Sequence, residues 1–153
     1  TWTRRDAINY QLDRDPFIVS PAALEHAGAT WLFFVDLSSE PARIASLTSA
    51  DGVAWDPTLA TPAAIGLGAV TPWHLDVFPV AGGFAMLISG YEEEFGKQSV
   101  YLATSPDLSS WTFRSEPLLS HRDPTLDVDT LYRSTGIVSG DRLVVWYSMS
   151  YVD

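Results

Sequence analysis

Cysteine is absent from the chain, which excludes disulfide bonds and thiolate metal sites but does not fix the compartment. Long apolar runs are absent as well. The chain contains no stretch of about 18 apolar residues, the pattern that predicts a membrane span. Its first residues show no signal-peptide pattern. A signal peptide on a longer precursor stays open, so the sequence does not choose between a secreted, a cell-surface and a bacterial cytoplasmic location.

Positive charge is also scarce in this acidic chain. Nine Lys and Arg residues face nineteen Asp and Glu residues, which gives a formal net charge of -10. Proteins that bind nucleic acid neutralise phosphates with clustered basic residues, so a nucleic-acid partner is excluded. The 153 residues are 46% hydrophobic and include six Trp, enough for a buried core. Tryptophan serves equally as core filler and as a stacking surface for sugar rings.

An internal repeat organises the chain. Residues 48–55 and 104–111 share the pattern Thr-Ser-x-Asp-x-x-x-Trp, and Trp55 and Trp111 lie 56 residues apart. In each copy the Ser and Asp residues predict a turn, after which the Trp opens a short outer strand. Three apolar strand pairs accompany the repeat, each joined by a Gly-containing turn at residues 27–29, 82–83 and 139–141.

The repeating unit is therefore four short antiparallel strands every 55 residues or so, which predicts an all-β fold of β-propeller blades. We expect an outer strand at 1–5, full blades at 12–57 and 71–115, and the first half of a blade at 130–153. These two and three-quarter blades fall short of a closed ring, which needs at least ~220 residues. The chain is thus expected to be part of a longer propeller, or else a small domain of stacked sheets. Its open strand edges favour pairing with the remainder of the propeller or with a second copy.

The starts of the innermost strands are where a propeller brings side chains together. Aligning the three strand pairs places Ser20, Asp76 and Ser134 in corresponding positions, with His74 and Tyr132 two residues before the latter two. Asp76 interrupts an apolar run. Because burying an unpaired charge costs several kcal/mol, its carboxylate is either hydrogen-bonded in the interior or faces a polar cleft.

Two neighbours of this set, Trp73 and Arg133, are also candidates. Trp73 precedes an inner strand and is a stacking platform for a sugar ring, whereas Trp31 and Trp146 fall inside strands and are expected in the core. Arg133 is placed to pair with Asp76 and hold it ionised. His74 is expected either to hydrogen-bond a sugar hydroxyl or Asp76, or to be buried in its strand.

The segment Trp73-His74-Leu75-Asp76-Val77 resembles the Trp-Ala-Pro-Asp-Val strand of the five-bladed propeller glycoside hydrolases, the superfamily of arabinanases, β-xylosidases and levansucrases or invertases. The Ser-Pro-Asp-x-x-x-Trp turn at 105–111 is similar to a turn common there, and residues 131–134 and 146–148 resemble its later blades. The resemblance implies a carbohydrate-active protein that hydrolyses or binds glycosidic substrates in a central cleft. No cofactor is implied.

The resemblance carries one site residue over directly. In arabinanase-type members the Asp of this strand tunes a pKa and orients the substrate, and Asp76 takes its place. In these members the general base is the Asp of an Asp-Pro pair, and its position falls on Ser20-Pro21 here. The general acid is the Glu of a Glu-Gly-Pro sequence, and its position falls on residues 132–134. Neither position holds a carboxyl group in this chain. Inversion at a glycosidic carbon needs two carboxyl groups ~6.5 to 9.5 Å apart. The sequence therefore leaves open a hydrolase completed by other segments, a non-catalytic glycan-binding or receptor-binding module, and a structural role for Asp76.

Other polar segments are weaker candidates. Asp15-Pro16 lies five residues before the position of the expected base, and residues 122–124 resemble the Arg-Asp-Pro of invertase-type members but fall in a linker. The glutamates at 92–94 are expected to form a solvated loop. Residues 121–129 are rich in oxygen ligands, yet they lack the Gly and the bidentate Glu of a calcium loop, so no metal site is predicted.

Overall fold

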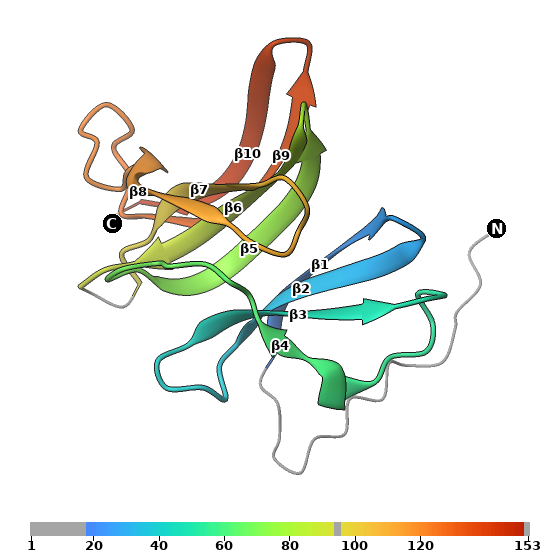
Figure 1. Cartoon of the computed structure of the whole chain (residues 1–153). Helices are drawn as coiled ribbons and strands as arrows, with labels where there is room; N and C mark the ends of the chain where they lie inside the picture. The colour runs from blue at the N-terminus through green and yellow to red at the C-terminus, as the bar shows by residue number, and fades with distance from the viewer. Residues whose placement is uncertain (1–17, 94–95, 152–153) are drawn as a thin grey trace, which may run out of the picture.

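The computed structural model describes residues 18–93 and 96–151, and within them the fold is all-β, as predicted. The expected strand at 1–5, the pair Asp15-Pro16 and the last glutamate of the 92–94 run lie outside the described residues. The described part contains ten strands and one short 3₁₀ helix, η1 (Pro57–Leu59) (Figure 1).

The strands form three antiparallel sheets, each built from neighbours in the sequence. The first sheet contains β1 (Ile18–His26), β2 (Ala29–Asp36), β3 (Arg43–Ser49) and β4 (Thr61–Pro62). The second contains β5 (Thr71–Val80), β6 (Gly83–Tyr91), β7 (Ser99–Ser105) and β8 (Thr112–Leu119). The third contains β9 (Thr130–Ser139) and β10 (Arg142–Ser150). The first strand of the second sheet, β5, contacts both β1 and β9, which is the arrangement of propeller blades around an axis.

The repeated turns form as the sequence predicts. In one copy the Asp51 carboxylate accepts hydrogen bonds from the backbone N–H groups of Val53 (2.9 Å) and Ala54 (2.8 Å). In the other, Asp107 accepts from Ser109 (2.9 Å) and Ser110 (3.3 Å). These bonds satisfy backbone donors that no strand partner reaches, so the turn has a local cause.

The outer strands differ between the two copies. Trp111 directly precedes β8, but Trp55 leads into η1, because Asp56 accepts the N–H of Thr58 at 2.9 Å and starts a helical turn. The fourth strand of the first sheet, β4, is only two residues long and lies beyond the expected blade boundary at residue 57.

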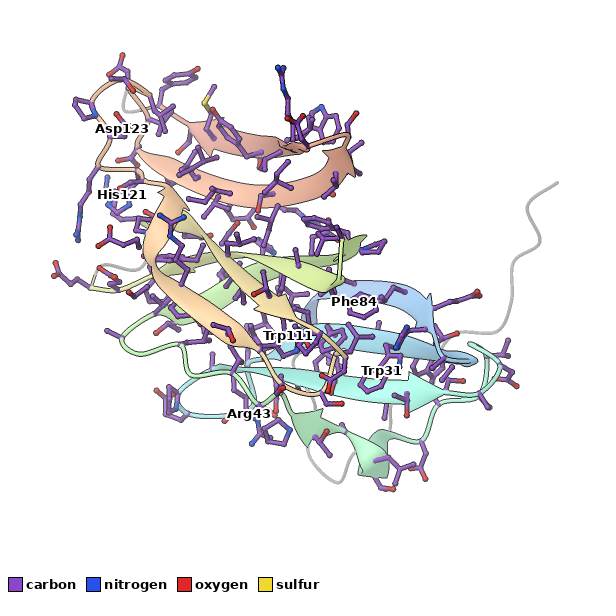
Figure 2. All side chains as sticks on the ribbon, turned by 45° about the horizontal axis from the view of Figure 1, so that its top comes forward. Trp31, Arg43, Phe84, Trp111, His121 and Asp123 are labelled. Atoms are coloured by element: carbon purple, nitrogen blue, oxygen red, sulfur yellow. The ribbon has the colours of Figure 1, made fainter. Side chains whose placement is uncertain are left out.

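Two hydrophobic cores lie between the sheets. Between the first and second sheets, the fully buried Phe33 stacks on Trp31 with ring centroids 6.0 Å apart and meets Trp111 edge-on at 5.6 Å (Figure 2). Between the second and third, Phe78 and Leu87 are buried against β9 and β10. Trp31 is therefore a core residue, as expected. Trp146 is not: its side chain is 53% exposed, and its neighbours Val145 and Tyr147 are the residues that pack against the second core.

Asp36, at the end of β2, is a buried carboxylate whose two oxygens accept hydrogen bonds from two neighbouring residues. Arg43 donates through Nε at 3.2 Å and Nη2 at 3.0 Å, and Ser38 donates through both its backbone N–H and its hydroxyl. Burial alone would raise the pKa of Asp36, but the Ser38 hydrogen bonds and the Arg43 guanidinium together lower it below the ordinary value of 3.8. The charged form is thus favoured by folding.

This shift predicts an acid-sensitive contribution to stability. Because the folded-state pKa is the lower one, the contribution is fully present above the unfolded-state value near 4 and is lost as the pH falls through the folded-state value. Urea unfolding between pH 7 and pH 2 should show a steeper fall for the natural protein than for Asp36→Asn in the window below about pH 4. Parallel curves for the two proteins in that window would contradict the assignment.

Candidate functional site

The three inner strands each carry a β-bulge near the end at which they begin. Trp73 is the extra residue in β5 and Tyr132 is the extra residue in β9, each seven residues before the end of its strand. In β1 the bulge contains Ser20 and Pro21. A bulge bends its strand and re-aims side chains, and bulges are frequent beside active sites. The starts of β1, β5 and β9 are therefore the candidate site.

His74 follows the Trp73 bulge and lies in an aromatic cluster. Its ring centroid is 4.6 Å from that of Tyr132 and 6.2 Å from that of Trp73, with both contacts edge-on. Although His74 is only 7% exposed, neither ring nitrogen has a hydrogen-bond partner in the described part of the chain. Burial lowers the pKa of His74, and the charge of Arg133 lowers it further. At neutral pH the ring is uncharged and offers one donor and one acceptor.

Asp76 lies two residues further along β5 and is half-buried. Its Oδ2 accepts a hydrogen bond from the Thr135 hydroxyl at 2.6 Å and contacts the Gly136 N–H at 3.4 Å. The expected partner, Arg133, is not among these donors. The carboxylate is therefore hydrogen-bonded to β9, which is one of the two expected alternatives, but Thr135 was not the expected partner.

Two of the expected site residues take part in packing between strands. Ser20, at a φ of +54°, exchanges hydrogen bonds of 3.2 Å with the N–H and C=O of Leu75, and it is 6% exposed. Ser134, equally buried, faces the Ser89 hydroxyl at 3.4 Å. Both serine side chains thus hold one sheet against the next.

The alignment of Ser20, Asp76 and Ser134 is wrong by one or two residues. Counted back from the hairpin ends, the positions that correspond to Asp76 are Ala22 and Thr135, each four residues before the end of its strand. The bulges at Trp73 and Tyr132 do not cause the difference between Ser134 and Thr135, because each lies seven residues before the end of its strand. The turns cause it: glycine is the second residue of the Ala81-Gly82 turn but the first residue of the Gly140-Asp141 turn, so equal counts from the glycine reach Ser134 instead of Thr135.

The segment between β8 and β9 forms a local turn and pairs with the loop after β6. Asp123 accepts the Thr125 N–H at 2.9 Å and the Thr125 hydroxyl at 2.7 Å, which makes a local turn ahead of β9. Arg122 is paired with Glu92 and Glu93. Among residues 18–93 and 96–151, no group of three or more His, Asp and Glu side chains is arranged to hold a metal ion. The same ranges contain no helix with the length and apolarity that a membrane crossing needs.

Comparison with known proteins identifies the fold. No protein-family model and no curated protein sequence matches the chain. Among solved structures, a thermostable family-43 glycoside hydrolase matches 85% of the chain with a TM-score of 0.65 and 17% identity. A fructan 1-exohydrolase IIa from Cichorium intybus matches 89% (TM-score 0.64, 20% identity), and a β-fructofuranosidase from Bombyx mori matches 93% (0.63, 15%).

These matches show the fold: the described strands are arranged as propeller blades are in the solved structures of these glycoside hydrolases, which is the fold that the sequence predicts. The match covers 41% of the family-43 enzyme, 28% of the exohydrolase and 31% of the fructofuranosidase, so the chain spans less than half the length of each. At these identities the likeness establishes the fold and not the substrate.

Proposed function

We propose that the starts of β5 and β9 bind the sugar of a glycosidic substrate. The observation that carries this proposal is the buried His74 ring with both nitrogens unpartnered in the described structure. An unmade hydrogen bond on a buried group costs about 1 to 3 kcal/mol. A sugar hydroxyl both donates and accepts, so it satisfies either nitrogen of a neutral imidazole.

The surroundings of His74 support a carbohydrate over other ligands. Trp73 and the 47% exposed Tyr132 provide aromatic surface against which the apolar face of a sugar ring packs. Asp76, two residues along the strand, supplies an acceptor for a further hydroxyl. Arg133, whose charge lowers the pKa of His74, adds a donor at the start of β9.

We further propose that the full protein hydrolyses glycosidic bonds, with Asp76 orienting the substrate and adjusting the pKa of the acid. The fold shared with propeller glycoside hydrolases favours this activity. The general acid and base would come from other segments, since hydrolysis needs a pair of carboxyl groups around the scissile bond. A second candidate is a non-catalytic glycan-binding module. It is favoured by Ser20 and Tyr132, which stand where the resemblance expects the base and the acid and carry no carboxyl group. A five-bladed ring stays a prediction.

The test uses the full-length protein with chromogenic arabinosides, xylosides, fructosides and galactosides, together with calorimetric binding of the corresponding sugars. Release of the chromophore from one of them supports the hydrolase. Binding without release supports the glycan-binding module. Neither binding nor release from the whole panel would overturn both proposals.

Asp76→Asn separates a substrate-orienting role from a structural one. The amide oxygen still accepts from Thr135, so the free energy of unfolding should change by less than about 1 kcal/mol. Loss of the negative charge should lower kcat by about 100-fold or more, the range typical of acid–base partners. The comparison variant is Thr135→Val, which keeps the charge, removes the donor and should leave most activity. A loss of several kcal/mol of stability in Asp76→Asn would instead mark a structural carboxylate.

A further inference from the structure

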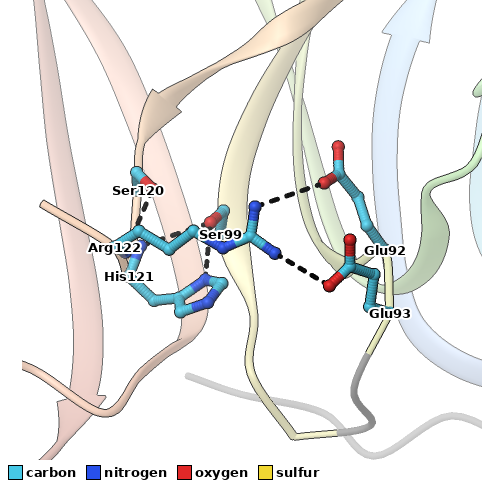
Figure 3. A network of polar contacts seen from close by, with 6 residues as sticks. All are labelled: Glu92, Glu93, Ser99, Ser120, His121 and Arg122. Atoms are coloured by element: carbon cyan, nitrogen blue, oxygen red, sulfur yellow. Dashed lines mark hydrogen bonds and ion pairs between the residues drawn. The ribbon is translucent and has the colours of Figure 1, made fainter.

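A polar cavity of about 320 Å³ lies at the end of the second sheet where β5 begins. It is enclosed by the loop that follows β6, the start of β7 and the segment between β8 and β9 (Figure 3). Its volume is at the lower end of the range for small-molecule sites. The side chains that line the cavity include Glu92, Lys97, Ser99, Tyr101, Arg122 and Asp129.

Ion pairs join the two walls of the cavity. Arg122 reaches from the β8–β9 segment to Glu92 at 3.8 Å and Glu93 at 3.5 Å (Figure 3), and Lys97 pairs with Asp129. The Arg122 side chain is 58% exposed. Exposed pairs contribute at most about 1 kcal/mol, so Arg122 can turn its N–H groups to a ligand at little cost.

The inner wall of the cavity is built from buried hydroxyl groups. Ser99 and Tyr101 are each 3% exposed, and the Ser99 hydroxyl lies 2.9 Å from Nδ1 of His121 (Figure 3). Burial raises the pKa of Tyr101, and the Glu92 charge raises it further. The phenol is therefore a neutral donor and acceptor at physiological pH.

The lining selects the chemistry of the ligand. Lys97 and Arg122 each pair with a carboxylate, and the carboxylates of the lining outnumber these two cations. The cavity therefore offers an anion no unpaired positive charge. A metal ion lacks a suitable cluster within the described residues. A neutral polyhydroxyl compound fits the cavity better than an anion or a metal ion, because the lining offers both hydrogen-bond donors and acceptors.

A backbone hydrogen bond links the cavity loop to the strand that carries Tyr132. The Leu131 N–H donates to the Gln98 carbonyl at 3.1 Å, so the cavity loop meets β9 one residue before Tyr132. We propose that the cavity is a second subsite, which holds a further neutral sugar unit of an oligosaccharide whose first unit contacts His74 and Tyr132. This inference rests on the proposed carbohydrate function and specifies its substrate as an oligosaccharide.

The test is a ligand ladder. The full-length protein is titrated calorimetrically with xylo-, arabino- and fructo-oligosaccharides of one to four units. In the series that binds, we expect affinity to rise about tenfold or more at one added unit, the effect of one or two hydrogen bonds to a charged group. Arg122→Met should remove that rise and leave the affinity of the shortest bound ligand unchanged. Arg114→Met is the matched control, because it removes the same charge from exposed β8 outside the cavity.

The outcomes distinguish the subsite from the site it extends. An equal rise with chain length in Arg122→Met and the natural protein overturns the subsite but leaves the His74 site standing. A rise that Arg114→Met also removes overturns it too, since the effect is then one of net charge. Binding that depends on Arg122 but not on His74 supports the cavity and overturns the His74 site. No binding by any oligosaccharide overturns both.

Discussion

Replacing His74 by Phe should weaken sugar binding about tenfold to 100-fold while leaving the protein as stable as before, or more stable. The natural ring places two nitrogens in a site that is 7% exposed, where neither has a partner among the described residues. A phenyl ring keeps the edge-on contacts with Tyr132 and Trp73 and removes the unmet hydrogen bonds. Replacing buried nitrogens that make no hydrogen bond by apolar atoms removes their desolvation penalty, so the change is neutral or stabilising.

The expected size of the two effects separates function from packing. Two lost hydrogen bonds to the ligand correspond to a rise in Kd of about tenfold to 100-fold, measured by calorimetry. The free energy of unfolding in urea should stay level or rise by about 1 kcal/mol. The control is His26→Phe, because His26 also meets an aromatic ring edge-on, Phe84 at 4.8 Å, but at the opposite end of its strand. A His74→Phe protein that binds sugar normally would remove the basis of the proposed site.

Gly83→Ala should be among the most destabilising single methyl additions in the second sheet. Gly83 begins β6 at a φ of +154°, and a Cβ there would lie 2.2 Å from the Ser105 carbonyl oxygen and 2.9 Å from Cα of Pro106. Both obstacles are backbone atoms of the repeated turn, so neither can move without separating β6 from β7. Backbone strain and overpacking each cost about 1 to 3 kcal/mol, which predicts a loss of about 2 to 6 kcal/mol.

The neighbouring glycine provides the control for this loss. Gly82 has a φ of +81°, but a Cβ at that position would meet nothing within 4 Å. Gly82→Ala should therefore cost only the left-handed backbone penalty of about 1 to 2 kcal/mol. Urea unfolding of the two variants measures the difference. Equal losses would mean that β7 shifts freely and that the turn does not fix the spacing of the strands.

The fold could be predicted because its signals are local. The Gly-containing turns and the Ser-x-Asp turns each satisfy their own backbone groups, as Asp51 and Asp107 do, so three sheets follow from short stretches of sequence. The weaker outer strand of the first sheet was not predictable in the same way. There Asp56 and Pro57 start η1 and compete with the strand that Trp55 was expected to open.

The site was only partly predictable from the sequence. Trp73, His74 and Tyr132 lie in contact at the starts of β5 and β9. Thr135 was missed as the partner of Asp76, because glycine is the second residue of one hairpin turn (Gly82) and the first residue of the other (Gly140), so equal counts from the glycine reach Ser134. The cavity beside Arg122 was missed for a different reason: its walls come from two loops that meet only in the folded chain.

The meander topology has an evolutionary consequence. Within residues 18–93 and 96–151, each sheet is built from strands that follow one another in the chain, and none of these strands crosses into another sheet. A gene segment that encodes one such unit can therefore be copied in tandem without rethreading the chain, and each copy packs against the previous one. The two Thr-Ser-x-Asp-x-x-x-Trp turns, 56 residues apart, have the spacing that tandem copies of one unit would have.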